Sequence, residues 1–289
     1  MTKVKEDVEV WCLGGAHLDH IAKPKTALTA ESSSPGIIQT GFGGVAYNIA
    51  ASLNRLGAKT TLVGAVGEDL GGQALAAKLL DQGIENRLIK QAFPTGSYLA
   101  IDDEQGRLVH AVSDLRALEE LDPAVLAQAL TEKPSTAALL LDANLLEDQI
   151  TAILEAQEDC FVAVEVVSIT KSLRLRSVLD RVDALFCNLV EANTLLRRNL
   201  NSPSDAARQL MKLGPNIVSV TNGGEAAALF SDGCCFEKMP KKVEASTTNG
   251  AGDCYAATLL FGLLSTIDPE AAMQQALEAA ANHLEGTHP

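Results

Sequence analysis

The stretch TTNGAGDCYAATLLFGLL, residues 247–264, places two glycines and an acid directly before an apolar run of helical length. The run predicts a buried helix with Asp253 in its first turn and Gly250 just ahead of it. Glycines let backbone N–H groups turn toward one point at a helix N-terminus, where the macrodipole adds partial positive charge. The stretch therefore indicates either an ordinary helix start, with Asp253 complementing the dipole, or an anion site.

An acid beside an anion site is unfavourable unless it has to face a hydroxyl group that attacks the anion. Transfer of a phosphoryl group to an alcohol has this requirement. It needs in-line alignment, neutralised phosphoryl oxygens and a base that accepts the hydroxyl proton. The stretch is thus compatible with a phosphoryl-transfer site, and the rest of the chain has to decide between the two interpretations.

Composition limits the partners of the chain. Its 289 residues carry a formal charge of −14, so there is no broad basic field for a nucleic acid polymer or an anionic membrane. We find neither a signal peptide at the start nor an apolar window of about 20 residues, and we expect a cytoplasmic protein. The six cysteines form no C-x-x-C pair, which favours reduced thiols and disfavours zinc.

Apolar runs of strand length alternate with segments of helical length along most of the chain. This alternation predicts an α/β fold with a mostly parallel central sheet covered by helices on both faces, and we interpret residues 1–289 as one domain. The helix with the clearest pattern is expected at about 45–56. The expected strands lie at 8–13, 60–67, 137–143, 160–167, 183–188 and 216–224.

Two segments interrupt this alternation. Residues 17–42 are polar and contain two prolines and a serine cluster, so they read as loop or edge-strand material. Residues 96–114 hold two strand-like runs joined by Asp103-Glu104-Gln105-Gly106, which is a hairpin signal. Together the two segments predict a small β-lid over the edge of the main sheet.

In an open parallel sheet, ligands bind beyond the carboxyl ends of the strands. Asp19 follows the first expected strand, where its local sequence fits a turn-forming aspartate at least as well as a site residue. Gly43 and Gly44 precede the helix that carries Asn48 and offer close backbone approach to a ligand. A dinucleotide fingerprint would have to follow the first strand directly, and the Walker pattern is absent, so both of these nucleotide sites are disfavoured.

Two longer matches go beyond these local patterns. GGVAYNIAASLNRLG (43–57), followed after nine residues by Gly67, resembles the first signature of the ribokinase-like, or PfkB, family of carbohydrate kinases. TTNGAGDCYAATLL (247–260) resembles its second signature, and the order and spacing of the two agree with the family. The resemblance implies a three-layer α/β/α sandwich with a β-lid and an ATP-dependent phosphotransferase that acts on an alcohol group.

The resemblance also assigns roles residue by residue. It makes Asp253 the general base and the backbone of Gly250, Ala251 and Gly252 the anion hole. Glu191, in an Asn-x-x-Glu element with Asn188, would hold Mg²⁺ through water. The positions implied for the acceptor are His17, Asp19, Gly43, Gly44, Asn48 and Lys171, and those implied for the nucleotide are Asn188, Thr221, Gly223 and Asn249.

Within the family, three features resemble the pseudouridine kinases. These are Pro35-Gly36 before the glycine pair, the lid run TGSYLAIDDEQGRLVHAVSD, and the elements LLLDANL and VEVVSITKS. The chain departs from that group at Glu165-Val166, where Asp-Pro is usual, and at Ser113-Asp114, where Asn-Asp is usual. His17 occupies a position that is often asparagine in the PfkB family. Pseudouridine is therefore the expected acceptor, while ribose, a fructose-type sugar, adenosine, or a catalytically impaired ligand-binding role stay open as alternatives.

The resemblance implies ATP and Mg²⁺ as cofactors and leaves dependence on a monovalent cation open. The expected partner is a small sugar or nucleoside. The exposed edges of the lid strands also allow a homodimer in which two lids cover each other.

Overall fold

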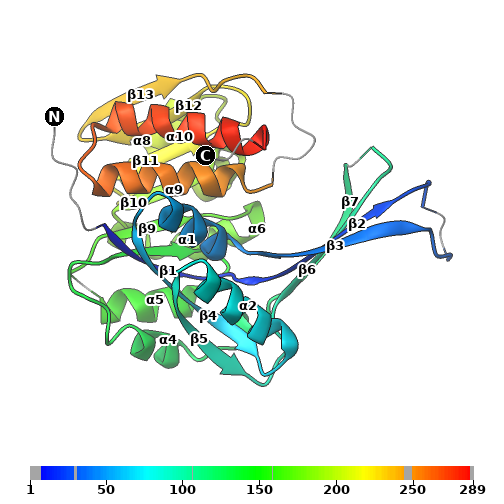
Figure 1. The fold of residues 1–289 in the computed structure, drawn as a ribbon. Helices are drawn as coiled ribbons and strands as arrows, with labels where there is room; N and C mark the ends of the chain where they lie inside the picture. Colours follow the sequence, from blue (N-terminus) through cyan, green and yellow to red (C-terminus); the bar gives the residue numbers. More distant parts are fainter. Residues whose placement is uncertain (1–7, 29–30, 106, 158, 244–248, 287–289) are drawn as a thin grey trace.

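The computed structural model describes residues 8–28, 31–105, 107–157, 159–243 and 249–286. Residues 29–30 and 106 of the expected lid, and Thr247 and Thr248 of the second signature, lie outside the described residues. Within the described ranges, a large sheet lies between two layers of helices and a small sheet projects from one side (Figure 1). The expected α/β class with a mostly parallel sheet and a small β-lid is confirmed.

The described part of the large sheet has nine strands in the order β13-β12-β11-β10-β9-β8-β1-β4-β5. Along this order, β11 to β5 are parallel, whereas β12 pairs antiparallel with β11 and β13. Central parallel strands are buried on both faces, which explains apolar runs such as ALLLD in β8. The strands are β1 (Glu9–Leu13), β4 (Lys59–Gly67), β5 (Glu85–Gln91), β8 (Ala138–Asp142), β9 (Val162–Glu165), β10 (Ala184–Asn188), β11 (Ile217–Thr221), β12 (Ala227–Ser231) and β13 (Cys234–Lys238).

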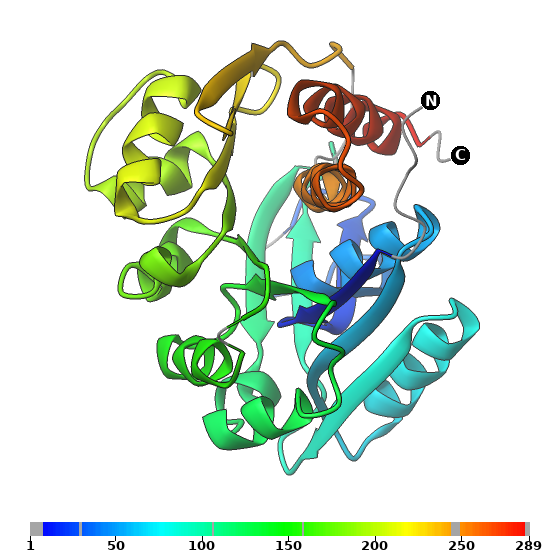
Figure 2. The same cartoon turned by 90° about the vertical axis from the view of Figure 1, so that its left-hand side faces the viewer.

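Two apolar cores, one on each face of the sheet, hold the helices in place. One core joins the sheet to α1 (Val45–Arg55), α2 (Leu70–Asp81), α9 (Ala251–Leu264) and α10 (Pro269–Leu284). In Figures 1 and 2, α9 and α10 lie side by side. The other core lies under α3 (Arg116–Glu119), α4 (Pro123–Ala129), α5 (Glu147–Ala156), α7 (Leu189–Leu196) and α8 (Pro203–Leu210), with α6 (Ile169–Ser172) at its edge.

The small sheet has the order β3-β2-β6-β7 and forms the arm on the right of Figure 1. It is built from β2 (His17–Pro24), β3 (Gly36–Gly43), β6 (Ser97–Asp102) and β7 (Leu108–Asp114). Strands β2 and β6 pair in parallel, and each pairs antiparallel with its hairpin partner. The two separate insertions therefore meet in one sheet, and the polar stretch after residue 16 is strand along much of its length.

The fold brings three kinds of chain end to one place. The carboxyl ends of β8, β9, β10 and β11 lie along one edge of the large sheet, as parallel pairing requires. The lid strand β3 ends at Gly43 and runs directly into α1. Because α1 and α9 pack side by side, the start of α9 also reaches this edge. Ligands of open α/β sheets bind at such an edge.

Candidate active site

The start of α9 has the geometry of an anion site. Gly250 precedes the helix in the left-handed region, with φ of 79°, a conformation that glycine adopts without strain. The Cys254 N–H donates to the Gly250 carbonyl at 2.9 Å and closes the first turn. The N–H groups of Ala251, Gly252 and Asp253 precede that bond, so they have no partner inside the helix. A Cβ on Gly252 would meet no described atom within 4 Å, which leaves its backbone open to a ligand.

Asp253 lies in the first turn of α9, and its side chain contacts α1. The side-chain amide of Asn48 donates to its Oδ2 at 2.7 Å, although the two residues are 205 positions apart in the chain. Burial raises the pKa of Asp253 to about 7, and the bond from Asn48 opposes that rise. The negative charges of Asp142 and Asp19 also contribute to the raised pKa of Asp253. A carboxyl group with a pKa in this range can accept a proton near neutral pH.

A cavity of about 160 Å³ opens beside Asp253. Two of its lining residues, Asn188 and Glu191, cap α7 reciprocally: the Glu191 N–H donates to Asn188 Oδ1 and the Asn188 N–H donates to Glu191 Oε2, both at 2.9 Å. This capping box fixes the Glu191 carboxylate at the cavity. The cavity is lined by Val45, Glu165, Val167, Phe186, Cys187, Asn188, Glu191, Thr221, Gly252, Asp253 and Tyr255.

Glu165 and Glu191 are the carboxyl groups of the cavity lining that could contribute to holding a cation. Burial raises the pKa of Glu165, and the charges of Glu191 and Asp253 raise it further, so three carboxyl groups share a space in which a cation would be favourable. No group of three acidic, histidine or cysteine residues within the described ranges has the arrangement of a complete metal site.

The acceptor side of the site, named for the residues that are predicted to bind the acceptor, depends on glycines at the end of the lid. A Cβ on Gly43 would lie 2.2 Å from Asp19 Oδ2, so only glycine allows the carboxylate to lie against this backbone. Gly44 has φ of 104°, and a Cβ there would lie 2.2 Å from the Gly15 carbonyl oxygen. Both glycines of the first signature are therefore required by close approach between the lid, the loop after β1 and α1.

Two aromatic rings stand next to Asp19. His17 Nδ1 lies 2.9 Å from Asp19 Oδ1, and the His17 and Tyr98 ring centroids are 6.3 Å apart. Asp19 and Tyr98 are direct partners across β2 and β6, so their side chains share one face of the lid. Burial raises the pKa of Tyr98, and the Asp19 charge adds to that rise. The result is an aromatic wall, His17 and Tyr98, beside the carboxylate.

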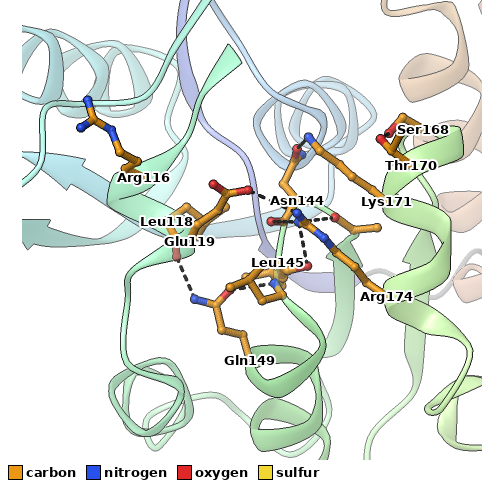
Figure 3. A network of polar contacts seen from close by, with 12 residues as sticks. Arg116, Leu118, Glu119, Asn144, Leu145, Gln149, Ser168, Thr170, Lys171 and Arg174 are labelled. Atoms are coloured by element: carbon orange, nitrogen blue, oxygen red, sulfur yellow. Dashed lines mark hydrogen bonds and ion pairs between the residues drawn. The ribbon is translucent and has the colours of Figure 1, made fainter. Parts of the chain in front are cut away.

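Lys171 takes part in a polar network at the end of β8, shown in Figure 3. Its Nζ donates to Asn144 Oδ1, and Asn144 Nδ2 donates to Asp142 Oδ2 at 2.9 Å. Arg174, one turn further on, donates to the carbonyls of Ala143 and Asn144. Burial lowers the pKa of Lys171, while the Asp142 charge opposes the change. Lys171 is thus held by Asn144 at the end of β8, and it is not among the residues that line the cavity beside Asp253.

Asp142 is the buried centre that links these parts. Its Oδ2 accepts the backbone N–H groups of Gly15 at 2.9 Å and Ala46 at 2.8 Å, and its Oδ1 accepts the Asn144 N–H at 2.9 Å. The loop after β1, the first turn of α1 and the end of β8 therefore converge on one carboxylate. Burial raises the pKa of Asp142, and its hydrogen bonds oppose the rise.

The structure brings together most, but not all, of the residues expected from the sequence. Asn188, Glu191, Thr221, Gly252 and Asp253 line one cavity, and Asn48 bonds to Asp253. His17, Asp19, Gly43 and Gly44 form the adjoining acceptor side. Gly223 and Asn249 do not line the cavity: Gly223 lies in the turn before β12, and the Asn249 carbonyl contacts α10. The sequence analysis assigned no role to Tyr98, Asp142 or His283, and noted Glu165 only as a departure.

A helix N-terminus with open N–H groups, a carboxyl group that can accept a proton near neutral pH and an adjoining β-lid together fit a phosphotransferase that acts on an alcohol group. The family model for pfkB family carbohydrate kinases matches residues 8–286. The chain belongs to this family and is a sugar or nucleoside kinase of the PfkB type.

Among characterised relatives, the pseudouridine kinase of Escherichia coli is 30% identical over 263 residues, which cover 89% of this chain and 84% of the relative. The pseudouridine kinase of Arabidopsis thaliana is also 30% identical, over 76% of this chain and 65% of its own length. The predicted PfkB family and the predicted similarity of this chain to pseudouridine kinases are both confirmed.

Solved structures agree with the fold. A carbohydrate kinase from Agrobacterium tumefaciens superimposes with a TM-score of 0.82 at 29% identity, covering 96% of this chain and 91% of its own. Ribokinase from Arabidopsis thaliana, solved with ribose and ATP, superimposes with a TM-score of 0.78 at 21% identity, over 96% of this chain and 93% of its own, and supports the fold alone. Within the described part of the chain, we find no helix with the length and apolar character that crossing a bilayer requires.

Proposed function

We propose that this chain transfers the γ-phosphoryl group of Mg·ATP to the primary 5′-hydroxyl of a ribosyl compound, with pseudouridine as the acceptor. The observation that carries the proposal is the position of Asp253. Its carboxyl group bonds to Asn48 on the acceptor side and lines the cavity that holds Asn188, Glu191 and Thr221. It therefore stands where an acceptor hydroxyl would meet a phosphoryl group.

In the proposed reaction, Asp253 accepts the proton of the hydroxyl group as the hydroxyl oxygen attacks the γ-phosphorus, and the bond from that phosphorus to the bridging oxygen breaks so that ADP leaves. The N–H groups of Gly250, Ala251 and Gly252 stabilise the negative charge on the transferring phosphoryl oxygens, and the α9 macrodipole adds to this effect. When bound, ATP supplies the phosphoryl group and Mg²⁺ neutralises its charge. Glu191 and Glu165 are the carboxylates placed to hold the cation, with Asn188 as the cap that orients Glu191.

Three features support a nucleoside as acceptor. The wall of His17 and Tyr98 offers flat rings beside Asp19, on which a base can stack. Lys171, which donates to Asn144 at the end of β8, has an ammonium group with further N–H donors, and these suit the carbonyl oxygens of a pyrimidine base. Two relatives that are 30% identical to this chain over most of its length are named as pseudouridine kinases. We propose that residues 1–289 act as one cytoplasmic kinase domain.

The test is a panel of acceptors with Mg·ATP: pseudouridine, uridine, adenosine, ribose and fructose. We expect turnover with pseudouridine to exceed that with each of the others. Greater turnover of another acceptor would replace the proposed substrate but keep the kinase. No turnover of any acceptor, with ATP binding retained, would favour the alternative of a catalytically impaired ligand-binding member. Asp253→Asn provides the background rate in each reaction.

The pH dependence of the reaction should report the protonation of Asp253. Because the base must be deprotonated, kcat/KM should rise with pH and level off above an apparent pKa of about 7. Asn48→Ala removes the donor that stabilises the carboxylate, so the apparent pKa should move upward. Rates from pH 5.5 to 9 would measure both. A flat profile in the wild-type protein, or a downward shift in the variant, would contradict the assignment of Asp253 as the base.

We also propose that two copies pair through their lids. On the lid face opposite Asp19, Ile38 and Val112 have exposed fractions of 70% and 65%, and Leu99 lies across from Val112. A projecting sheet with apolar side chains on this face is expected to be covered by a second copy. Sedimentation should give a dimer, and Val112→Glu should shift it toward monomer. A monomeric wild-type protein at micromolar concentration would refute the pairing.

A further inference from the structure

The last turn of α10 contacts the loop that leads into the start of α9. His283 Nε2 lies 2.9 Å from the backbone carbonyl oxygen of Asn249. A carbonyl oxygen can only accept, so Nε2 carries the proton and donates. Asn249 directly precedes Gly250, the left-handed residue from which the N–H groups of the first turn of α9 are directed. One side chain from α10 therefore fixes the peptide next to the proposed anion hole.

The same imidazole also lies against Gly250. A Cβ on Gly250 would stand 3.0 Å from His283 Nε2 and 3.2 Å from its Cε1, so the ring is in contact with the glycine backbone. The end of α10 also makes a contact with Lys241. Lys241 Nζ pairs with Glu285 Oε1 at 2.7 Å, immediately after the helix. This ion pair is largely exposed and contributes little energy, but it places Lys241 at the same helix terminus as Asn249.

We propose that His283 is a positioning residue for phosphoryl transfer. It holds the Asn249 carbonyl and the Gly250 backbone so that the N–H groups of the first turn of α9 face the transferring phosphoryl group. The inference rests on the proposed function, because it assumes that this helix start binds that group. His283 itself is placed to touch neither the acceptor nor Asp253, and its effect passes through the backbone.

The position of such N–H groups matters more in the transition state than in the ground state. Donors to a developing charge act over 2.7–3.1 Å, and the loss of one costs about 10²–10³-fold in rate. Loss of the His283 bond would loosen the loop without removing a donor, so we expect a smaller effect, of about tenfold. The effect should appear in kcat, which depends on the transition state. The affinity for Mg·ADP should stay unchanged, because ADP lacks the transferred phosphoryl group that these N–H groups face.

Two substitutions of similar size separate the hydrogen bond from helix packing. His283→Met removes the donor, whereas His283→Gln keeps an N–H near the position of Nε2, and both residues are good helix formers. We expect His283→Met to lower kcat about tenfold, with the acceptor KM and the Mg·ADP affinity within about twofold of wild type. His283→Gln should recover most of the rate. Gln274→Ala, which removes an exposed contact to Glu278 on the same helix, is the matched control and should not change kcat.

Wild-type kcat in His283→Met would overturn the inference. It would also be overturned if His283→Gln lost as much activity as His283→Met and both had lowered melting temperatures, because the role would then be packing of α10. Failure of the proposed function would give a different result, because the wild-type protein itself would then phosphorylate no acceptor. In that case the inference would fall together with the proposed function.

Discussion

Asp253→Asn is expected to lower kcat for phosphoryl transfer by about 10²- to 10⁴-fold, the range that general bases contribute. The side-chain amide of asparagine has almost the same size as the carboxyl group but cannot accept the hydroxyl proton. Its oxygen can still accept the bond that Asn48 donates to Asp253. The change therefore removes the base and leaves the contact between α1 and α9 in place. Initial rates with the best acceptor of the panel measure the effect.

Stability and nucleotide affinity serve as controls for this variant. The folded-state pKa of Asp253, about 7, lies above the ordinary value of 3.8. The stability that this group contributes is thus fully present below about pH 4 and is lost as the pH rises through 7. At pH 8 the variant should unfold at the same or a higher denaturant concentration than wild type, and it should bind Mg·ATP with similar affinity. Unchanged kcat would refute the assignment of the base.

The large sheet was predictable where its strands are buried on both faces. Strands β8 and β10 consist of almost uninterrupted apolar residues, and this pattern predicts central parallel strands without knowledge of their neighbours. Strand β5, with the sequence ENRLIKQ, was not predicted. It is one of the two edge strands of the described sheet, and its mixed polarity reflects one partly exposed face. The apolar pattern of a strand reflects how many of its faces are buried. An edge strand therefore has a weaker apolar pattern than a central strand.

The lid shows the same limit. Its face opposite Asp19 is exposed and its strands bend away from the core, so the polar stretch after residue 16 read as loop or edge material although β2 and β3 are each eight residues long. The hairpin signal at 103–106 and the two strand-like runs beside it were the clearest indication of strands, whereas residues 17–42 were consistent with either a loop or an edge strand. That the two insertions pair through β2 and β6 follows from their position in the folded chain and not from either segment.

The site was predictable as a set of motifs but not as a set of contacts. The glycines and acids of both signatures stand out because few other residues tolerate their backbone geometry or provide their chemistry. The bond from Asn48 to Asp253 spans 205 positions, and the contact of His283 with Asn249 joins α10 to the loop before α9. Such pairs depend on how helices pack across the sheet. Gly223 illustrates the converse, since its motif is present but the residue lies in a turn outside the cavity.

The second large effect that we predict is a loss of stability when Asp142 is replaced. Asp142→Leu is expected to lower the free energy of unfolding by roughly 3 kcal/mol or more, because each buried N–H left without an acceptor costs about 1–3 kcal/mol. Three backbone N–H groups, those of Gly15, Ala46 and Asn144, depend on this carboxylate. Urea unfolding at pH 7.5 would measure the change. Since whole domains are stable by only about 5–15 kcal/mol, the loss should be visible as reduced yield of folded protein.

The matched control is Asp81→Leu, the same substitution at a side chain that is 79% exposed and lies 3.8 Å from Lys78. We expect this variant to stay within about 0.5 kcal/mol of wild type. Asp142→Asn separates charge from hydrogen bonding. Its single oxygen can accept only part of the donors, and its NH₂ group would face N–H groups, so its stability should fall between wild type and Asp142→Leu. If Asp142→Leu were as stable as Asp81→Leu, the three N–H groups would have found other acceptors, and the convergence of β1, α1 and β8 on one carboxylate would not be what holds the acceptor side together.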